Sequence, residues 1–235
     1  MIFSNECYLC NRCNKFKRGD CTQGDDIFCQ KLFRVDSLYS NSLLSNIQRK
    51  PGEFILLQNE YDLEAFKFLT EFEKNIVDNI QQGKNLYIYS QTTGNGKTAW
   101  AIRLLQSYIL NSWYSVSCDK CLALFINIPR FLLELKSNIS QHSDYVEHIQ
   151  KNVLNCDLVI WDDVATKGTT EFETEHLLSM INSRIDNGKS NIYTSNIIPQ
   201  HLNEFIGSRL TSRLMMSQLI EFKDPDKRFI VAERR

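Results

Sequence analysis

The stretch SQTTGNGKTAW, residues 90–100, limits the folds open to this chain more than any other feature. It lies between the apolar run LYIY and the longer amphipathic run AIRLLQSYIL, so it predicts a strand, a tight loop and a helix in that order. The end of the loop, Gly96-Lys97-Thr98, has the form of a phosphate-binding loop, which requires that context. The stretch therefore predicts a nucleotide site in an α/β fold.

The residue types in this loop suit phosphate binding. Its two glycines let backbone N–H groups close around a phosphate without a side chain in the way. The helix that begins near Lys97 directs its positive end at the anion, and the lysine reaches the outer phosphates. The hydroxyl of Thr98 can bind Mg²⁺. The predicted ATP-binding residues of the loop are Gly94, Asn95, Gly96, Lys97 and Thr98.

Gln91 departs from the phosphate-loop pattern, which has a glycine at this position. The position mainly shapes the turn, so the change should distort the loop less than the loss of Gly96 would. The alternative interpretation is an ordinary glycine turn between a strand and a helix, with no ligand.

A second stretch, DLVIWDDV at 157–164, supports the nucleotide interpretation. Its apolar residues are followed by Asp162 and Asp163, so a buried strand ends in two carboxylates. Ligands bind at the carboxyl ends of the strands in open α/β sheets. We expect Asp162 to hold Mg²⁺, directly or through water, and Asp163 to orient or deprotonate the attacking water. The alternative is a pair of solvated aspartates.

The remaining hydrophobic pattern alternates between strand and helix periodicity. Further strands are predicted at 122–128, 157–161, 190–196 and 218–222, and helices at 62–80, 98–110, 129–136, 144–154, 171–185 and near Leu202 and Leu210. Pro129 suits the first turn of its helix, and Gly188 suits the end of the helix before it. This alternation predicts a parallel sheet with helices on both faces.

Four stretches of the chain, taken in order, resemble the motifs of AAA+ ATPases of the bacterial helicase-loader group, the DnaC/DnaI type. They are GNGKT, LVIWDD, YTSN and GSRLTSRL. The transposition ATPases of the IstB type are related to them. The resemblance covers residues 85–228. It implies a RecA-like P-loop AAA+ parallel sheet flanked by helices, without a C-terminal lid.

The resemblance also implies roles for three residues after the aspartate pair. Asn196, at the end of a predicted strand, resembles sensor 1, the polar group that contacts the γ-phosphate or the attacking water. Arg213, with Arg209 one helical turn before it, resembles the arginine-finger motif, which supplies charge in trans to the γ-phosphate of a neighbouring subunit. The alternative for the arginines is a solvated helix face. Asp163 stands where many AAA+ proteins have glutamate.

The first 29 residues hold five of the eight cysteines. Zinc takes four ligands, and Cys-x-x-Cys pairs supply two from one turn. We favour Cys10, Cys13, Cys21 and Cys29 as zinc ligands, with Cys7 as the alternative member. A set of reduced cysteines without metal, or an iron–sulfur cluster, is also compatible with the spacing. The resemblance adds that loaders of the DnaI type carry an N-terminal zinc module that contacts the helicase.

The composition restricts the possible partners and compartments. The net charge is −1, so contact with nucleic acid requires a local patch. No run approaches the ~18 apolar residues that span a bilayer, and the N-terminus lacks the features of a signal peptide. We expect a cytoplasmic protein without membrane contact. We divide it into a cysteine-rich zinc-binding and partner-binding module at 1–50, a linker and leading helix at 51–82, and an AAA+ ATPase domain at 83–235.

Together these features predict an ATPase that loads a replicative helicase onto single-stranded DNA in a bacterium or a phage, with ATP, Mg²⁺ and Zn²⁺ as cofactors. Subunits are expected to associate through the arginine-finger face. The segment at 128–151, which matches the DNA-contacting part of loaders, offers Arg130, Lys136 and Lys151. Two alternatives stay open: a transposase-partner ATPase of the IstB type, and an adaptor that holds ATP without hydrolysing it.

Overall fold

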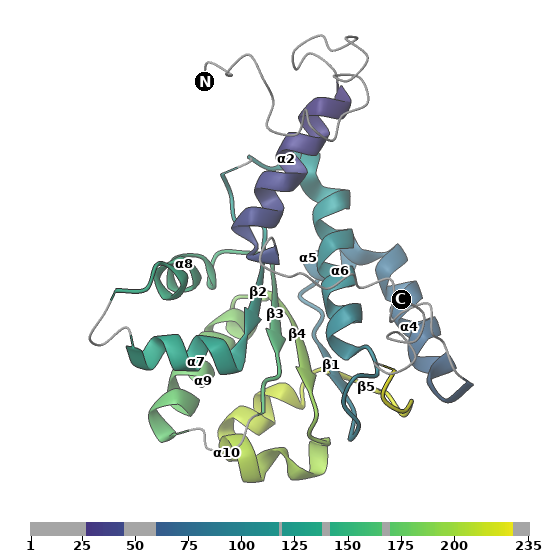
Figure 1. Cartoon of the computed structure of the whole chain (residues 1–235), viewed down its shortest axis with the longest axis vertical. Helices are drawn as coiled ribbons and strands as arrows, with labels where there is room; N and C mark the ends of the chain where they lie inside the picture. The colour runs from purple at the N-terminus through teal and green to yellow at the C-terminus, as the bar shows by residue number, and fades with distance from the viewer. Residues whose placement is uncertain (1–26, 45–59, 118, 138–141, 166–169, 228–235) are drawn as a thin grey trace.

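The computed structural model describes residues 27–44, 60–117, 119–137, 142–165 and 170–227. Within these ranges a five-stranded parallel sheet lies at the centre of the molecule, in the strand order β2-β3-β4-β1-β5 (Figure 1). The strands are β1 (Leu86–Tyr89), β2 (Ala123–Asn127), β3 (Leu158–Asp162), β4 (Ser190–Ser195) and β5 (Gln218–Glu221). Each predicted strand is present, and the predicted α/β class with a parallel sheet is confirmed.

The register of the sheet brings the carboxyl ends of the strands together. Tyr89, the last residue of β1, pairs with Ser195 of β4 and with Glu221 of β5. Asn127 of β2 pairs with Asp162 of β3. Because the strands are parallel, residues that end or follow them lie at one edge of the sheet, where ligands bind in folds of this class. β3 and β4 are buried throughout, whereas β5, at the border, is largely exposed.

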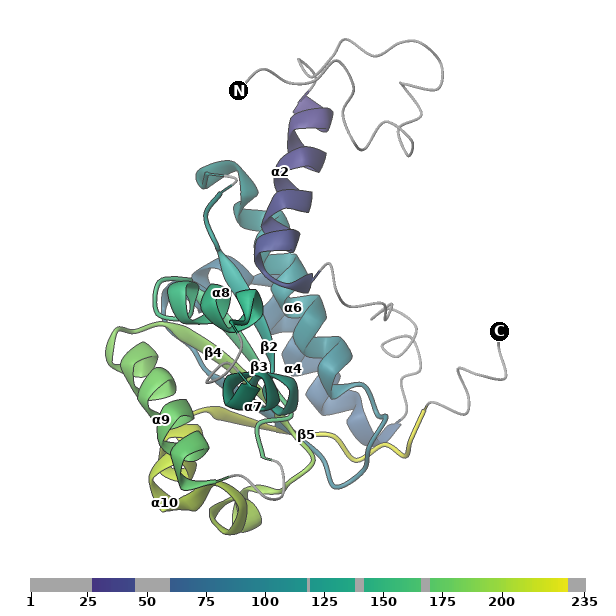
Figure 2. The ribbon, with the colours of Figure 1, turned by 60° about the vertical axis from the view of Figure 1, so that its left-hand side comes forward.

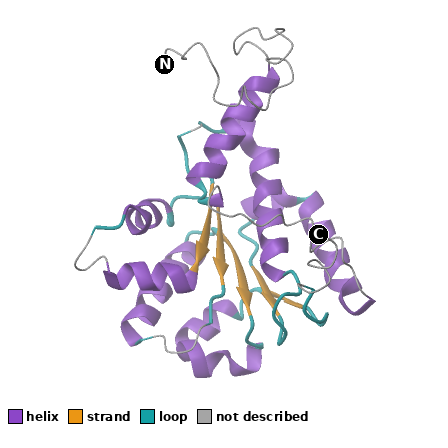
Figure 3. Cartoon of the chain, in the orientation of Figure 1, coloured by secondary structure: helices purple, strands orange, loops and turns teal. Residues whose placement is uncertain are grey.

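Helices cover both faces of the sheet, as predicted (Figures 2 and 3). They are α2 (Ile27–Asn41), α4 (Leu63–Lys74), α5 (Ile76–Gln81), α6 (Lys97–Ser112), α7 (Ile128–Ser137), α8 (Asp144–Asn152), α9 (Glu171–Asp186) and α10 (Leu202–Leu214). One hydrophobic cluster joins α2, α4, α5 and α6 to one face, and a second joins α7, α8, α9 and α10 to the other. None of these described helices is both long enough and apolar enough to cross a membrane.

One predicted helix is broken in the structure, and the two short helices predicted near Leu202 and Leu210 meet at a break. The predicted helix at 62–80 is two helices, α4 and α5, because Asn75 leaves the helical range at φ −107° and ψ 30°. The side chain of Asn75 donates a hydrogen bond to the backbone carbonyl of Glu71 at 3.2 Å, and such bonds compete with the helix. In α10, Gly207 has φ 72° and ψ 164°, which favours glycine, so α10 consists of the two short helices expected there.

The sequence does not predict α2, which lies within the proposed N-terminal module. Val35 and Leu38 of α2 are buried in the same cluster as α6. The carbonyl of Ser42, just after α2, accepts a hydrogen bond from the N–H of Phe125 in β2 at 2.9 Å. Figure 1 shows the other end of α2 projecting beyond the sheet, away from the arrowheads of the strands. The last part of the proposed module therefore packs against the α/β core.

Most of the predicted metal ligands lie outside the described residues, namely Cys7, Cys10, Cys13 and Cys21. The side chain of Cys29 is likewise outside them, and so is Cys118. Cys121 is buried, and its thiol donates to the carbonyl of Asn41 at 3.3 Å. Burial raises the pKa of this thiol, as in a structural cysteine rather than a reactive one.

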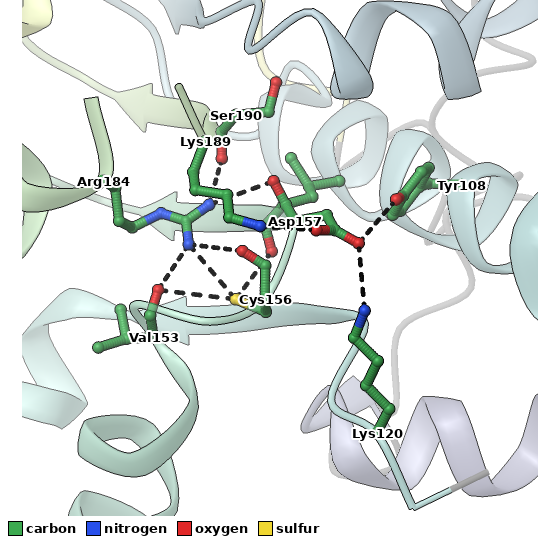
Figure 4. Close-up of polar contacts among 9 residues, drawn as sticks. Tyr108, Lys120, Val153, Cys156, Asp157, Arg184, Lys189 and Ser190 are labelled. Carbon is green, nitrogen blue, oxygen red and sulfur yellow. Dashed lines mark hydrogen bonds and ion pairs between the residues drawn. The ribbon is translucent and has the colours of Figure 1, made fainter. Parts of the chain in front are cut away.

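A buried arginine joins the elements at the amino end of the sheet (Figure 4). The guanidinium of Arg184, in α9, is fully buried and donates to the carbonyls of Val153 at 2.5 Å and Cys156 at 2.9 Å. It also donates to the carbonyl of Ser190 at 2.6 Å and to the side-chain oxygen of Asn191 at 2.8 Å. Burial lowers the pKa of Arg184. These contacts join α9 to the chain before β3 and to the start of β4.

Asp157 extends this network to the other face of the sheet (Figure 4). Its carboxylate accepts hydrogen bonds from the ammonium of Lys189 at 2.8 Å and from the hydroxyl of Tyr108, in α6, at 3.2 Å. The ammonium of Lys120 lies 3.9 Å from the same carboxylate. The amino end of the sheet is therefore stabilised by polar contacts, whereas the carboxyl end carries the candidate site.

Replacing Arg184 by methionine should lower the free energy of unfolding by about 3–5 kcal/mol, because the change leaves several buried acceptors without donors. The matched control is Arg103→Met. Arg103 is partly exposed and contacts Glu73 at 2.8 Å, so its loss should cost less than about 1 kcal/mol. Denaturant unfolding of both variants measures the difference. Equal losses would contradict the role given to the buried network.

Candidate nucleotide-binding site

The loop after β1 has the predicted context of a strand before it and a helix after it. Lys97 begins α6, and Gly96 before it adopts a left-handed conformation with φ 105°. Gly94 has φ 69°. Residues other than glycine rarely adopt either φ value, so the backbone conformation of the loop requires glycine at both positions. A glycine loop that leads into a helix N-terminus presents N–H groups and a positive dipole to an anion.

Side chains within the loop hold it in shape. Lys97 is only 5% exposed, and its ammonium donates to the carbonyl of Thr92 at 2.9 Å and to the side-chain oxygen of Asn95 at 3.1 Å. The amide of Asn95 donates to the hydroxyl of Ser90 at 2.6 Å, which also accepts from the N–H of Thr92 at 3.0 Å. These bonds enclose the turn at Gln91, where the pattern has a glycine. The sequence did not predict this role for Ser90 and Thr92, although short polar side chains commonly bond to nearby loop backbone.

Asp162 is the centre of a second set of hydrogen bonds, at the carboxyl end of β3. One carboxylate oxygen accepts from the hydroxyl of Thr98 at 2.8 Å and from the hydroxyl of Thr194 at 2.7 Å. The other accepts from the amide of Asn127 at 3.2 Å. Asp162 is 4% exposed. The structure thus brings together Thr98 and Asp162, and carboxylate and hydroxyl oxygens are ligands that suit Mg²⁺.

Asp163 has an unusual backbone conformation beside this centre. Its φ is 55°, in the left-handed region that costs a residue other than glycine about 1–3 kcal/mol and is often found at functional sites. Its N–H donates to the hydroxyl of Thr194 at 3.0 Å, and its carboxylate lies 3.5 Å from the amide of Asn196. Two predicted catalytic residues are therefore neighbours. The hydroxyl of Thr194 bonds both to the N–H of Asp163 and to the carboxylate of Asp162. The sequence did not predict a role for Thr194, although it lies within the motif YTSN.

Arg209 and Arg213 lie on the part of α10 that follows the break at Gly207. Figure 1 shows α10 at the end of the molecule toward which the strands point. The guanidinium of Arg209 contacts the carboxylate of Glu175 at 2.9 Å, and its side chain is 75% exposed. An exposed ion pair of this kind contributes little stability, so Arg209 can exchange Glu175 for another partner at low cost.

Comparisons with known proteins agree with this arrangement. A profile of the bacterial DnaA ATPase domain matches residues 63–221. The chromosomal replication initiator protein DnaA of Mycoplasma genitalium is 29% identical over 188 residues, which are 80% of this chain and 40% of that protein. This chain therefore spans less than half the length of that relative.

Solved structures share the fold. The DnaC helicase loader superposes with a TM-score of 0.57 at 22% identity, over 71% of this chain and 92% of that chain. The replication initiator DnaA bound to AMPPCP and single-stranded DNA superposes with a TM-score of 0.55 at 22% identity, over 76% of this chain and 52% of that chain. The resemblance to AAA+ loaders is confirmed at the level of the fold. Because the matching profile covers all five strands, the glycine-rich loop after β1 and the aspartate pair, this chain belongs to the family of the bacterial DnaA ATPase domain.

Proposed function

We propose that this chain binds ATP with Mg²⁺ at the carboxyl edge of its sheet and hydrolyses it during the initiation of DNA replication. The observation that carries the proposal is the 2.8 Å hydrogen bond between the hydroxyl of Thr98 and the carboxylate of Asp162. It joins the phosphate loop to the acidic end of β3, the pairing that a P-loop ATPase needs around its metal. The family of the chain and the replication proteins among its relatives support the same reaction.

The residues of the site divide the chemistry among them. Lys97 and the N–H groups of the loop would bind the phosphates, and Thr98 with Asp162 would hold Mg²⁺. The metal, when bound, neutralises charge on the phosphate oxygens. Asp163, beside the metal ligand, would orient the attacking water or accept its proton. Asn196 would donate a hydrogen bond to the γ-phosphate or to that water.

We further propose that the ATPase delivers a replicative helicase to single-stranded DNA. The superposition covers 92% of the solved chain of the DnaC helicase loader, and the solved structure of a replication initiator DnaA is bound to single-stranded DNA. The predicted DNA contacts on α7 already have acidic neighbours, because Arg130 contacts Glu134 at 2.8 Å and Lys136 contacts Glu173 at 3.0 Å. Binding of DNA there would have to displace these carboxylates, so we expect modest, salt-sensitive affinity.

Retention of a purified replicative helicase on the immobilised chain tests the loader function. We expect retention with ATP, and transfer of the helicase to single-stranded DNA. Retention of a transposase instead would support the IstB-like alternative. ATP binding without turnover, alone or with a partner, would support the adaptor.

Replacing Asp163 by asparagine should slow ATP turnover about 10²–10⁴-fold, the contribution of a positioned general base, while ATP affinity stays within a few-fold. Asparagine keeps the size of the side chain and tolerates the left-handed backbone, so the fold should persist. Steady-state turnover and nucleotide titration measure the two quantities. ATP turnover equal to that of the parent would show that Asp163 takes no part in the reaction.

We also propose one zinc ion per chain, held by cysteines among the first 29 residues. The double variant Cys21→Ser, Cys29→Ser should lose the metal, whereas Cys121→Ser should keep it, because Cys121 is buried in the core of the ATPase domain. Metal analysis of the purified proteins measures the zinc content of each variant. The double variant should still bind ATP, because the described core has its own hydrophobic clusters. Full zinc content in the double variant would refute the assignment.

A further inference from the structure

The chain after β5 lies against the phosphate loop. We call residues 222–227 the strap. Figures 1 and 2 show the yellow end of the described chain beside the teal loop that follows β1. The carbonyl of Asp224 accepts a hydrogen bond from the hydroxyl of Thr92 at 2.8 Å, and the N–H of Lys227 donates to the carbonyl of Gly94 at 3.0 Å. The hydroxyl of Thr93 donates to the carboxylate of Asp226 at 3.3 Å.

The contact between strap and loop is close as well as polar. A Cβ atom at Gly94 would lie 1.9 Å from a carboxylate oxygen of Asp226, so a larger residue here would have to displace that side chain, besides adopting a left-handed φ of 69°. Three successive residues of the loop, from Thr92 to Gly94, therefore bond to the strap. A change in the position of the strap would therefore change the conformation of the loop.

The strap is itself anchored by a buried ion pair. The ammonium of Lys227 lies 2.5 Å from the carboxylate of Asp224, and both side chains are fully buried. The ammonium also lies 5.0 Å from the ring centre of Phe66, in α4. A buried pair is costly to desolvate and requires close geometry, so it fixes position more than it adds stability.

A third buried charge holds the other end of the strap. The carboxylate of Asp62 accepts the N–H of Lys223 at 2.6 Å and that of Asp224 at 3.3 Å. Burial raises the pKa of Asp62 to about 6, opposed by the N–H of Lys223 and reinforced by the charge of Asp224. The start of α4, the strap and the phosphate loop thus form one connected unit.

We propose that the strap is a positioning element of the nucleotide site, in which the buried Asp224–Lys227 pair holds residues Thr92 to Gly94 in the shape that binds phosphate. The proposal rests on the proposed ATP binding and deepens it. The strap touches the loop from the side of β5 and carries none of the residues assigned to hydrolysis. Its loss should therefore weaken ATP binding and leave turnover at saturating ATP nearly unchanged.

Three variants test this. Lys227→Met leaves Asp224 buried without its counter-charge. The double variant Asp224→Asn, Lys227→Met removes both charges. The matched control is Lys223→Met, the same substitution at a strap side chain that is 61% exposed. For each we would measure the free energy of unfolding, the Kd for ATP and turnover at saturating ATP.

We expect Lys227→Met to lose both stability and affinity. In the double variant stability should recover, because the cost of a lone buried charge is gone, whereas the Kd for ATP should stay about tenfold above the parent value, equivalent to about one lost hydrogen bond. Lys223→Met should match the parent. A double variant that recovers the parent's affinity together with its stability would show that the pair is merely structural, and would overturn the proposal.

Hydrogen exchange provides a second, reciprocal test. If the strap positions the loop for nucleotide, nucleotide must in turn protect the strap. We expect ADP or the analogue AMPPCP to slow exchange of the backbone N–H of Lys227 in the parent protein. If hydrogen exchange at the N–H of Lys227 is unchanged at saturating nucleotide, the strap does not position the loop, and the proposal is wrong. A parent that binds no nucleotide at all would instead refute the proposed function, so the two failures are distinguishable.

Discussion

Replacing Lys97 by alanine should abolish ATP binding, with affinity falling about 100-fold or more and turnover falling with it. The ammonium of Lys97 is buried within the phosphate loop, where it already bonds to a carbonyl and an amide oxygen. Negatively charged phosphate oxygens are stronger acceptors than either, because the ammonium and the phosphate also attract each other as opposite charges. Alanine removes this charge from the site and leaves the glycines and the helix N-terminus in place.

Titration with a fluorescent ATP analogue measures the effect of Lys97→Ala. The control is Lys84→Ala, because Lys84 likewise bonds to a nearby asparagine, Asn79 at 2.7 Å, but lies before β1 at the amino end of the sheet. The control should bind ATP as the parent does. Parent-like affinity in Lys97→Ala would show that the glycine turn is no phosphate loop.

Replacing Arg213 by alanine should remove the rise in ATP turnover that occurs when subunits meet, a loss of about 10³–10⁵-fold where an arginine finger acts. Arg213 lies with Arg209 on the short helical segment of α10 that follows Gly207. An arginine that acts in trans touches the γ-phosphate of a neighbour, so its own subunit should keep its ATP affinity. The isolated chain should accordingly hydrolyse ATP slowly, and turnover per subunit should rise with protein concentration or with a helicase partner.

A mixing experiment separates action in trans from action in cis. Arg213→Ala subunits keep Asp163, and Asp163→Asn subunits keep Arg213. Each variant alone should be nearly inactive, while their mixture should regain turnover at interfaces where an intact Asp163 meets an intact Arg213. A mixture as inactive as its parts, or a silent Arg213→Ala, would mean that Arg213 is no finger in trans. The same mixture made with Lys97→Ala in place of Arg213→Ala should stay inactive, because that subunit binds no ATP.

Much of the fold follows from local patterns in the sequence. The five strands are short apolar runs, and most of the helices are amphipathic, so periodicity alone places them. The phosphate loop is also local, because its glycines are required by backbone angles within the loop itself. Breaks were harder to place. Asn75 interrupts a helical pattern that hydrophobic periodicity alone would continue, whereas the two short helices on either side of Gly207 were expected.

Other features depend on contacts between distant parts of the chain, and the sequence gives little sign of them. Thr194 bonds to Asp162 across neighbouring strands, and Arg184 bonds to carbonyls up to 31 residues away. The strap reaches the phosphate loop across more than 100 residues. Thr194, Arg184 and the charged pair of the strap are polar and buried, a combination that composition and periodicity assign to the surface.

The sequence by itself determined the class of the fold, the glycine-rich loop between β1 and α6, and the acidic end of β3, because each depends on neighbouring residues whose spacing matches a strand, a turn or a helix. Only the tertiary structure decided that Thr98 bonds to Asp162, that α2 packs on the α/β core, and that Asp224 and Lys227 lie buried beside the loop. The physical reason is the parallel sheet. Its register brings the ends of distant strands to one edge, and buried polar groups then bond to whatever partners that edge provides.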